Sequence, residues 1–293
     1  MKIAMILDSE FPPDPRVENE ALTLINSGHK VYLFCITYHD NEGSEEYKGI
    51  SINRVKVPKM VRSVSALAYT TPIYHFILKK VFSRVLNIDE FDAIHIHDIQ
   101  SARTFFELLE NKKIMRVLDL HENRPEIMKY YEHVNSLLGK VLINPNTWKK
   151  FEEKYIAKAD KVIVVTASAK EYYKSIYNES EGKFVVVPNS VNRSFIEKHD
   201  TDVDQEFIEK YKDNFVILYL GNTGERRGIG DVLETINLLK VEIPKLKFLC
   251  VGSSKSDTKW QEMVSKLNLE EHVDLLGWQD FEKFPTFLKA SDI

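Results

Sequence analysis

The length, composition and charge of the chain exclude several classes of protein. With 293 residues, of which 43% are hydrophobic and 29% charged, it has the composition of a soluble globular protein and room for two domains. The formal net charge of -4 argues against general nucleic-acid binding, which needs a basic surface.

Strands and helices alternate along the first two thirds of the chain. Apolar runs alternate with segments whose apolar residues recur at helical spacing, such as Val17, Ala21 and Leu24 before Gly28. The predicted strands are residues 2–7, 31–37, 51–57, 93–97, 115–120, 161–166 and 183–188, and the predicted helices are residues 15–28, 101–110, 148–159 and 168–177. This alternation is typical of an α/β fold with a doubly wound sheet.

A polar, acidic stretch at residues 197–213 precedes a second half in which the alternation begins again. Its predicted strands are residues 216–220, 247–251 and 273–276, and its predicted helices are residues 231–239, 260–267 and 280–290. We therefore predict two Rossmann-like domains, residues 1–192 and 193–293, that face each other across a cleft at the carboxyl ends of their strands. Residues 290–293 resemble the entry to another strand, which predicts an incomplete second domain in a truncated chain; the alternative is a genuinely short domain.

One turn in the second half has the features of a phosphate site. A buried strand is followed by a glycine-containing loop, two arginines and a helix, and the residues concerned are Gly221, Asn222, Gly224, Arg226 and Arg227. This order brings backbone N–H groups, a helix N-terminus and guanidinium charge together, which favours a phosphate-bearing nucleotide. The spacing is neither that of a P-loop nor that of a dinucleotide-binding loop. The alternative is an ordinary turn with a solvated pair of arginines.

Several motifs in a fixed order resemble one known family. They are the helix from Asp14 to the Gly28-His-Lys-Val31 turn, His95-Ile-His-Asp98, Asp119-Leu-His121, Val164-Val-Thr-Ala-Ser168, Val187-Pro-Asn-Ser-Val191, and Tyr219-x-Gly221 with Arg227-Gly228. With these motifs the chain resembles, over its whole length, a glycosyltransferase of the GT-B fold and of family 4. The resemblance implies retaining transfer of a sugar from a nucleotide-diphosphate sugar to a glycan or lipid-linked acceptor.

The same resemblance assigns roles to the two halves. Residues 1–192 would form the acceptor side, and residues 193–293 would bind the nucleotide sugar, which is a substrate, so that no cofactor is expected. The chain departs from the family pattern at Asn222, where many members have an arginine, and at Arg227, which replaces a lysine but can still hold a diphosphate. The opening loop 8–13 lacks the double glycine of many members. The paired glutamates of the family would lie beyond Ile293, so the chain as given is expected to be a poor catalyst.

Strand ends and the resemblance together indicate the site residues of the first half. His121 ends a buried strand and is expected beside the donor sugar and its phosphate as the catalytic residue, or else is a structural histidine. His97 and Asp98 suit acceptor positioning, or else cap the following helix. Arg16 follows a proline-rich loop and either binds an anionic acceptor or pairs with Glu20 at the i, i+4 spacing.

Two residues of the second half complete this set. Trp278 and Gln279 leave a strand where the resemblance places the nucleotide base. Stacking of Trp278 on the base is one interpretation, and a tryptophan buried in the core is the other.

Metal ions are not expected ligands of this chain. Asp202-Val-Asp204 imitates the Asp-x-Asp of metal-dependent transferases, but it stands in a charged interdomain stretch. No Cys/His cluster has zinc spacing. Departure of a diphosphate can instead be helped by arginine and backbone N–H groups.

The sequence predicts a cytoplasmic protein, with one segment that suits the inner face of a membrane. Cys35 and Cys250 stand in separate apolar runs and predict buried thiols in a reducing compartment. The first apolar run is too short for a signal peptide, and no run is long enough to span a bilayer. Residues 59–84 mix apolar and basic side chains, which predicts peripheral contact with anionic lipid or a lipid-linked acceptor. The alternative is a helix packed on the first domain with a solvated basic rim.

Three functions are compatible with these patterns. The first is a nucleotide-sugar glycosyltransferase that builds a surface glycan or glycolipid. The second is a nucleotide-sugar epimerase of the same fold, which needs no acceptor. The third is a non-catalytic nucleotide-binding module, which the missing glutamates favour.

Overall fold

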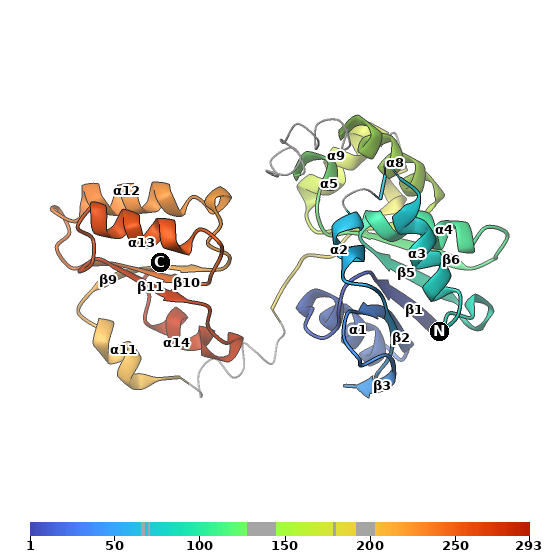
Figure 1. Ribbon diagram of the computed structural model, residues 1–293, viewed down its shortest axis with the longest axis horizontal. Helices are drawn as coiled ribbons and strands as arrows, with labels where there is room; N and C mark the ends of the chain where they lie inside the picture. Colours follow the sequence, from blue (N-terminus) through green and yellow to red (C-terminus); the bar gives the residue numbers. More distant parts are fainter. Residues whose placement is uncertain (66–67, 70, 128–144, 178–179, 192–202) are drawn as a thin grey trace. The chain divides into compact units, whose positions relative to one another are not determined.

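A computed structural model describes residues 1–65, 68–69, 71–127, 145–177, 180–191 and 203–293 of the chain. They form two compact units, Met1–Ser190 and Val191–Ile293, where the sequence predicts a boundary after residue 192 (Figure 1). Each unit contains a mostly or wholly parallel sheet with helices packed on it, so the predicted α/β class is confirmed. No helix in the described part of the chain combines the length and the apolar character needed to cross a bilayer.

The first unit is built on an eight-stranded sheet. Its strands are β1 (Lys2–Leu7), β2 (Lys30–Thr37), β3 (Gly43–Tyr47), β4 (Ile50–Lys56), β5 (Ala93–His97), β6 (Met115–Leu120), β7 (Lys161–Val164) and β8 (Phe184–Val186). The order is β3-β4-β2-β1-β5-β6-β7-β8, and β3–β4 is the antiparallel pair in an otherwise parallel sheet. The strand order reverses beside β1, and ligands of such sheets bind at the carboxyl ends of the strands near this point.

Helices cover both faces of this sheet (Figure 1). They are α1 (Pro15–Asn26), α2 (Met60–Val64), α3 (Ile73–Phe82), α4 (Ile99–Leu108), α5 (Arg124–Ile127), α8 (Pro145–Lys158) and α9 (Ala167–Tyr177), with 3-10 turns η2 (Ile88–Glu90) and η4 (Glu181–Lys183). Alternate residues of β1 face two separate cores. Ala4 and Ile6 belong to the core that includes residues of α3 and α4, and Ile3 and Met5 belong to the core that includes residues of α1. Burial on both faces explains why these strands are continuous apolar runs.

Helix α1 begins and ends at clear signals and carries two polar side chains to the sheet edge. The carboxylate of Asp14 accepts hydrogen bonds from the N–H groups of Arg16 and Val17, which caps the first turn. After the helix the chain turns at Gly28, whose φ of +83° favours glycine. This placement brings Arg16 and Glu20, one turn apart, toward the ends of the central strands.

The second unit has a three-stranded parallel sheet in the order β11-β10-β9. Its elements are α11 (Gln205–Tyr211), β9 (Phe215–Leu220), η5 (Glu225–Arg227), α12 (Ile229–Leu239), β10 (Leu246–Val251), α13 (Asp257–Lys266), β11 (Val273–Gly277), η6 (Phe281–Lys283) and α14 (Phe284–Lys289). Leu233, Phe248 and Trp260 join α12, β10 and α13 in one core. The backbone N–H of Leu218 in β9 donates to the carbonyl of Ile293 at 2.7 Å.

Strand β3 and helix α11 are among the elements that depart from the prediction. The exposed strand β3 was not predicted, because its residues are polar and it is defined by pairing with β4. The acidic stretch predicted as a linker contains helix α11 from residue 205 onward, while residues 192–202 lie outside the described residues. Asp202 of the Asp-x-Asp motif therefore lies outside them as well, and Asp204 caps α11 by accepting from the N–H of Phe207.

Candidate active site

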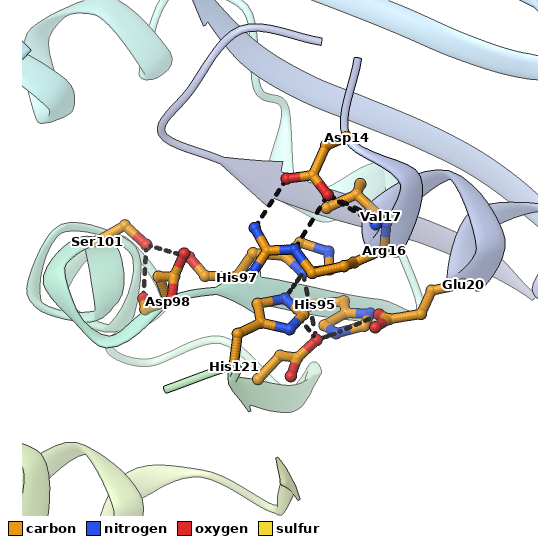
Figure 2. A network of polar contacts seen from close by, with 10 residues as sticks. Asp14, Arg16, Val17, Glu20, His95, His97, Asp98, Ser101 and His121 are labelled. Atoms are coloured by element: carbon orange, nitrogen blue, oxygen red, sulfur yellow. Dashed lines mark hydrogen bonds and ion pairs between the residues drawn. The ribbon is translucent and has the colours of Figure 1, made fainter. Parts of the chain in front are cut away.

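Polar side chains meet where β5 and β6 of the first sheet end. The register of these parallel strands places His97 beside Asp119. Alternate side chains of a strand share a face, so His95 lies on the side of His97, and His121 lies on the side of Asp119. Figure 2 shows the three histidines gathered near the first turns of α1.

Asp119 is the centre of what we call the His–Asp cluster, which consists of Glu20, His95, His97, Asp119 and His121. Its Oδ2 lies 3.2 Å from Nε2 of His95 and 3.3 Å from Nδ1 of His97. The same oxygen lies 3.3 Å from Nε2 of His121. Nδ1 of His97 and Nε2 of His121 are 3.2 Å apart, and Glu20 reaches from α1 to within 3.5 Å of Nε2 of His95. Asp119 and His97 are completely buried.

Burial and hydrogen bonding set the charges of this cluster. Burial alone would raise the pKa of Asp119, but hydrogen bonds from His95 and His97 outweigh it and hold that pKa below its ordinary range. Burial and the neighbouring Asp119 carboxylate raise the pKa of Glu20 to about 9, so Glu20 is protonated at neutral pH. Burial lowers the pKa of His97 to about 4 and also lowers the pKa of His121. At neutral pH Asp119 is therefore an ionised carboxylate, and His97 and His121 beside it are neutral.

Four members of the cluster have the chemical types of metal ligands. Ligand atoms of Glu20, His95, His97 and Asp119 lie within 4.8 Å of one another. The rings of His95 and His97 are stacked, however, with centroids 4.3 Å apart and planes 28° apart. Nε2 of His95 and Nδ1 of His97 both face Oδ2 of Asp119, at 3.2 Å and 3.3 Å, so these nitrogens are already engaged by the carboxylate. The geometry favours a hydrogen-bonded network at this place.

A polar cavity of about 400 Å³ lies at the same edge of the sheet, at the ends of β1 and β5. Its lining includes Asp8, Tyr74, Asp98, Gln100 and Arg124. Tyr74 donates a hydrogen bond to Asp8, and Nε2 of Gln100 lies 3.4 Å from the other oxygen of Asp8. Oε1 of Gln100 has no partner among the described residues although the side chain is buried. The cavity thus presents hydrogen-bonding groups that suit a ligand rich in hydroxyl groups.

Asp98, which lines this cavity, stands in a strained backbone conformation. Its φ is +65°, which is uncommon for a residue other than glycine and is often found at functional sites. Burial raises the pKa of Asp98 to about 6, partly offset by Arg124 and Arg16. Its side chain makes no capping hydrogen bond to α4, so the helix-capping alternative is wrong for Asp98.

Arg16 pairs with Asp14, with 2.9 Å between Nη2 and Oδ2. The predicted alternative of an i, i+4 pair with Glu20 is therefore wrong: the cap residue holds the guanidinium at the helix start, and Glu20 turns toward His95. Arg16 also lines the cavity that contains Asp98.

Several residues of this constellation were not predicted as site residues. His95, Asp119, Asp8 and Arg124 received no role, and Glu20 was named only as the alternative ion-pair partner of Arg16. The alternation His-x-His and Asp-x-His at the ends of two strands carried the missing signal, because residues two apart lie on one face. Glu20, which reaches the cluster from α1, carried no comparable signal in the sequence.

The predicted phosphate turn lies at the ends of β9 and β10 in the second unit. Gly221 and Gly252 follow these neighbouring strands, and a Cβ added to Gly252 would stand 1.7 Å from the carbonyl oxygen of Gly221. Arg226 and Arg227 are exposed in η5. Gly228 is the N-cap residue of α12, so the N-terminus of this helix has no side-chain cap.

Two backbone N–H groups that the sequence suggested as phosphate donors already donate hydrogen bonds to other groups of the protein. That of Gly221 donates to the carbonyl of Val251 at 2.9 Å, and that of Gly224 donates to Oδ1 of Asn222 at 2.9 Å. The anion-binding groups that the turn offers are therefore the first-turn N–H groups of α12 and the exposed Arg227.

Trp278 and Gln279 follow β11. The side chain of Trp278 is 70% exposed, so the alternative of a tryptophan buried in the core is wrong. Nε2 of Gln279 donates to the carbonyl of Leu276 at 2.9 Å, which holds the amide close to the strand end.

Family models match both units of the chain. The model described as Glycosyltransferase Family 4 matches residues 16–195, and the model described as Glycosyl transferases group 1 matches residues 200–293.

Two curated relatives illustrate the similarity in sequence. An uncharacterized glycosyltransferase of Methanocaldococcus jannaschii is 28% identical over 225 residues, which are 74% of this chain and 52% of that protein. One of the subunits of the phosphatidylinositol N-acetylglucosaminyltransferase of Arabidopsis thaliana is 21% identical over 94% of this chain and 58% of its own length. The chain thus spans little more than half of these relatives.

Two solved structures share the fold. Sucrose-phosphate synthase of Thermosynechococcus elongatus has a TM-score of 0.73 and 16% identity, and the match covers 99% of this chain and 74% of that one. Anabaena HepE, solved in complex with UDP, has a TM-score of 0.61 and 14% identity, with 100% and 72% covered. Since the family model spans more than half of the sequence and the second model matches the remaining unit, the chain belongs to glycosyltransferase family 4.

Proposed function

We propose that this chain transfers a sugar from a nucleotide-diphosphate sugar to a hydroxyl group of a glycan or lipid-linked acceptor, with retention at the sugar carbon. The observation that carries this proposal is that both units of this family member present polar groups after their strands, and that the two sets of groups differ in kind. One unit presents a buried histidine and a polar cavity, and the other presents an uncapped helix with arginine before it.

The donor diphosphate would bind in the second unit. Breaking the sugar–phosphate bond leaves negative charge on the departing diphosphate, and preorganised positive groups stabilise that charge. Arg227 and the N-terminus of α12 supply guanidinium and N–H groups in one turn. HepE was solved with UDP, which supports a nucleoside diphosphate as the ligand. Exposed Trp278 beside Gln279 offers a surface for the base.

The acceptor would bind in the cavity of the first unit. Carboxylates accept hydrogen bonds from hydroxyl groups, and Asp8 and Asp98 both line this cavity. Arg16 lines the same cavity as Asp98 and would bind an anionic part of the acceptor. His97, which precedes Asp98 in the sequence, would fix the position of His121. The Arabidopsis relative is named for transfer to phosphatidylinositol, which supports a lipid-linked acceptor.

The reaction would take place in the cytoplasm, at the inner face of the membrane. In the segment 59–84, one face of α3 is buried through Tyr74 and Leu78, while Met60, Ile73 and Phe76 are 68%, 53% and 60% exposed. The last turn of the same helix carries Lys79 and Lys80. Exposed apolar side chains beside lysines suit peripheral contact with anionic lipid.

Calorimetric titration of nucleoside diphosphates into the full chain tests the donor site. Arg227→Ala should weaken binding by about 2–3 kcal/mol, because it removes a charge-assisted contact. The matched control is Lys266→Ala, which removes the same charge from the exposed end of α13. Equal affinity of wild type and Arg227→Ala would contradict the donor site. An equal loss of affinity in Arg227→Ala and Lys266→Ala would show that the effect comes from the net charge of the chain and not from a contact of Arg227.

A further inference from the structure

We propose that Thr223 and Trp260 are positioning residues for the donor diphosphate. They attach the segment 223–230 to the start of α13, so that Arg227 and the first N–H groups of α12 are held in place before the ligand binds. The attachment follows from contacts within the second unit. Only the identity of the ligand rests on the proposed function, and Thr223 and Trp260 act through the turn without contacting the ligand themselves.

The segment that carries Arg227 touches Trp260 at both of its ends. At the first end, Nε1 of Trp260 donates a hydrogen bond to the carbonyl of Thr223 at 2.6 Å. At the other end, a Cβ added to Gly230 would stand 3.3 Å from Cζ3 of Trp260, so the indole ring lies against the second residue of α12. Trp260 is itself buried in the core of the second unit. One fixed side chain therefore holds both ends of the segment.

The side chain of Thr223 makes a further attachment to α13. Its hydroxyl group donates to Oδ1 of Asp257, the first residue of that helix, because a carboxylate can only accept. The two oxygens of Asp257 also accept from the backbone N–H of Ser254, at 3.0 Å and 3.1 Å. Oγ of Ser254 lies 3.0 Å from Oγ1 of Thr223. Asp257 thus joins the turn that follows β9 to the turn that follows β10.

Between its two ends, the segment is held by weaker contacts. The three residues of η5 are exposed. The ion pair between Glu225 and Lys259, at 2.8 Å, has both side chains 55% exposed, and such pairs stabilise little. Thr223, in contrast, is 3% exposed, so water competes poorly for its hydrogen bonds. The position of the turn therefore depends mainly on Thr223 and its partners in α13.

A turn held in this way suits the binding of a diphosphate. Groups that are already in place lose little freedom when a ligand binds, and this raises the affinity. The backbone N–H of Arg227 donates to the carbonyl of Gly224 at 2.8 Å, so the backbone at Arg227 follows the residue next to Thr223. Loosening of Thr223 should therefore displace Arg227 while the strands stay in place.

Calorimetric titration of the full chain with UDP, GDP and ADP tests the assignment, and the diphosphate that binds most tightly is compared with its nucleoside. Thr223→Val keeps the shape of the side chain and removes the hydroxyl group. It should weaken diphosphate binding about tenfold and leave nucleoside binding unchanged, because the base would lie at Trp278. Thr223→Ser keeps the hydroxyl group and should restore the diphosphate affinity. The matched control is Thr235→Val, which removes an exposed hydroxyl group from α12 and should change neither affinity.

Two results of this titration would overturn the positioning role. One is a folded Thr223→Val variant that binds the diphosphate as tightly as wild type does. The other is an equal loss of diphosphate and nucleoside affinity in Thr223→Val, since general loosening of the second unit would produce it.

Hydrogen exchange of single amides, followed by nuclear magnetic resonance, tests the attachment without any ligand. In Thr223→Val the amides of Arg227 and Gly228 should exchange about tenfold faster than in wild type, while those of β10 stay unchanged. Trp260→Phe, which lacks the indole N–H, is a second variant, and in it these two amides should accelerate more than those of β10. Unchanged exchange at Arg227 in either folded variant would refute the attachment.

The proposed function can fail separately from this inference. Faster exchange at Arg227 in Thr223→Val, in a chain that binds none of the three diphosphates, would leave the attachment standing and remove the assigned ligand. Diphosphate binding that is indifferent to Thr223→Val would leave the donor site standing and remove the positioning role.

Discussion

Replacing Gly252 by alanine should loosen the second unit, because the backbone at this position leaves no room for a methyl group. The added Cβ would stand 1.7 Å from the carbonyl oxygen of Gly221, at the end of the neighbouring strand. That oxygen belongs to the backbone and cannot rotate away. The two strand ends would have to separate, and the turn that precedes Arg227 would move with them.

Two costs add at this position. The φ of Gly252 is +139°, a conformation that costs other residues about 1–3 kcal/mol. Overpacking of a tight site costs about 1–3 kcal/mol more. Together they should lower the free energy of unfolding of the second unit by about 4 kcal/mol. Gly277→Ala is the matched control, because its φ is +66° and no heavy atom lies within 4 Å of its added Cβ. It should cost about 1–2 kcal/mol.

Hydrogen exchange followed by mass spectrometry on the full chain measures these costs locally. Amides of β9 and β10 should exchange about a thousandfold faster in Gly252→Ala and roughly tenfold faster in Gly277→Ala, since each 1.4 kcal/mol is a factor of ten. Amides of β1 and β5 in the first unit serve as the internal reference and should be unchanged. Equal acceleration by the two substitutions would refute the steric argument and leave backbone conformation as the whole effect.

Two further predictions concern Glu152 in the first unit and the proposed donor site in the second. Burial raises the pKa of Glu152 to about 7, although hydrogen bonds from Tyr177 and Tyr173 act to lower it. The contribution of the protonated carboxyl group to folding stability is therefore complete below pH 4.5 and is lost as the pH rises through 7. Glu152→Gln should therefore gain on the order of 3 kcal/mol relative to wild type between pH 5 and pH 8 in urea unfolding, and a pH-independent difference would contradict the cause. EDTA should leave the calorimetric affinity for a nucleoside diphosphate unchanged, because the proposed diphosphate site consists of Arg227 and the N-terminus of α12 and uses no metal ion. A loss that manganese or magnesium restores would show that a metal site had been missed.

The strands that carry the site could be predicted because burial determines their composition. β1, β5 and β6 begin and end at the predicted residues, since each is an apolar run between polar ends. Helix α11 could not be predicted in the same way, because most of its residues are polar and only Tyr211 is buried. Its helical structure depends on contacts with the second sheet, which are non-local.

The candidate site was predictable to the same degree. A strand end fixes where a side chain emerges, so His97, Asp98 and His121 could be identified as residues at strand ends. The partner of Arg16 could not, because Asp14 and Glu20 both lie within reach on one helix and the cap geometry decides between them. The inward turn of Glu20 depends on His95, which is far away in the sequence.

Strand β3 also bears on how copies of the chain meet one another. It forms one free edge of the larger sheet, and a free edge is where a second sheet can add by backbone pairing. Glu45 and Glu46 are exposed along this short edge, and Glu45 is held in place by the buried guanidinium of Arg54 at 2.7 Å. Two such edges brought together would set carboxylates against carboxylates. Electrostatic repulsion therefore protects this side of the sheet from self-association while the chain folds and at high concentration.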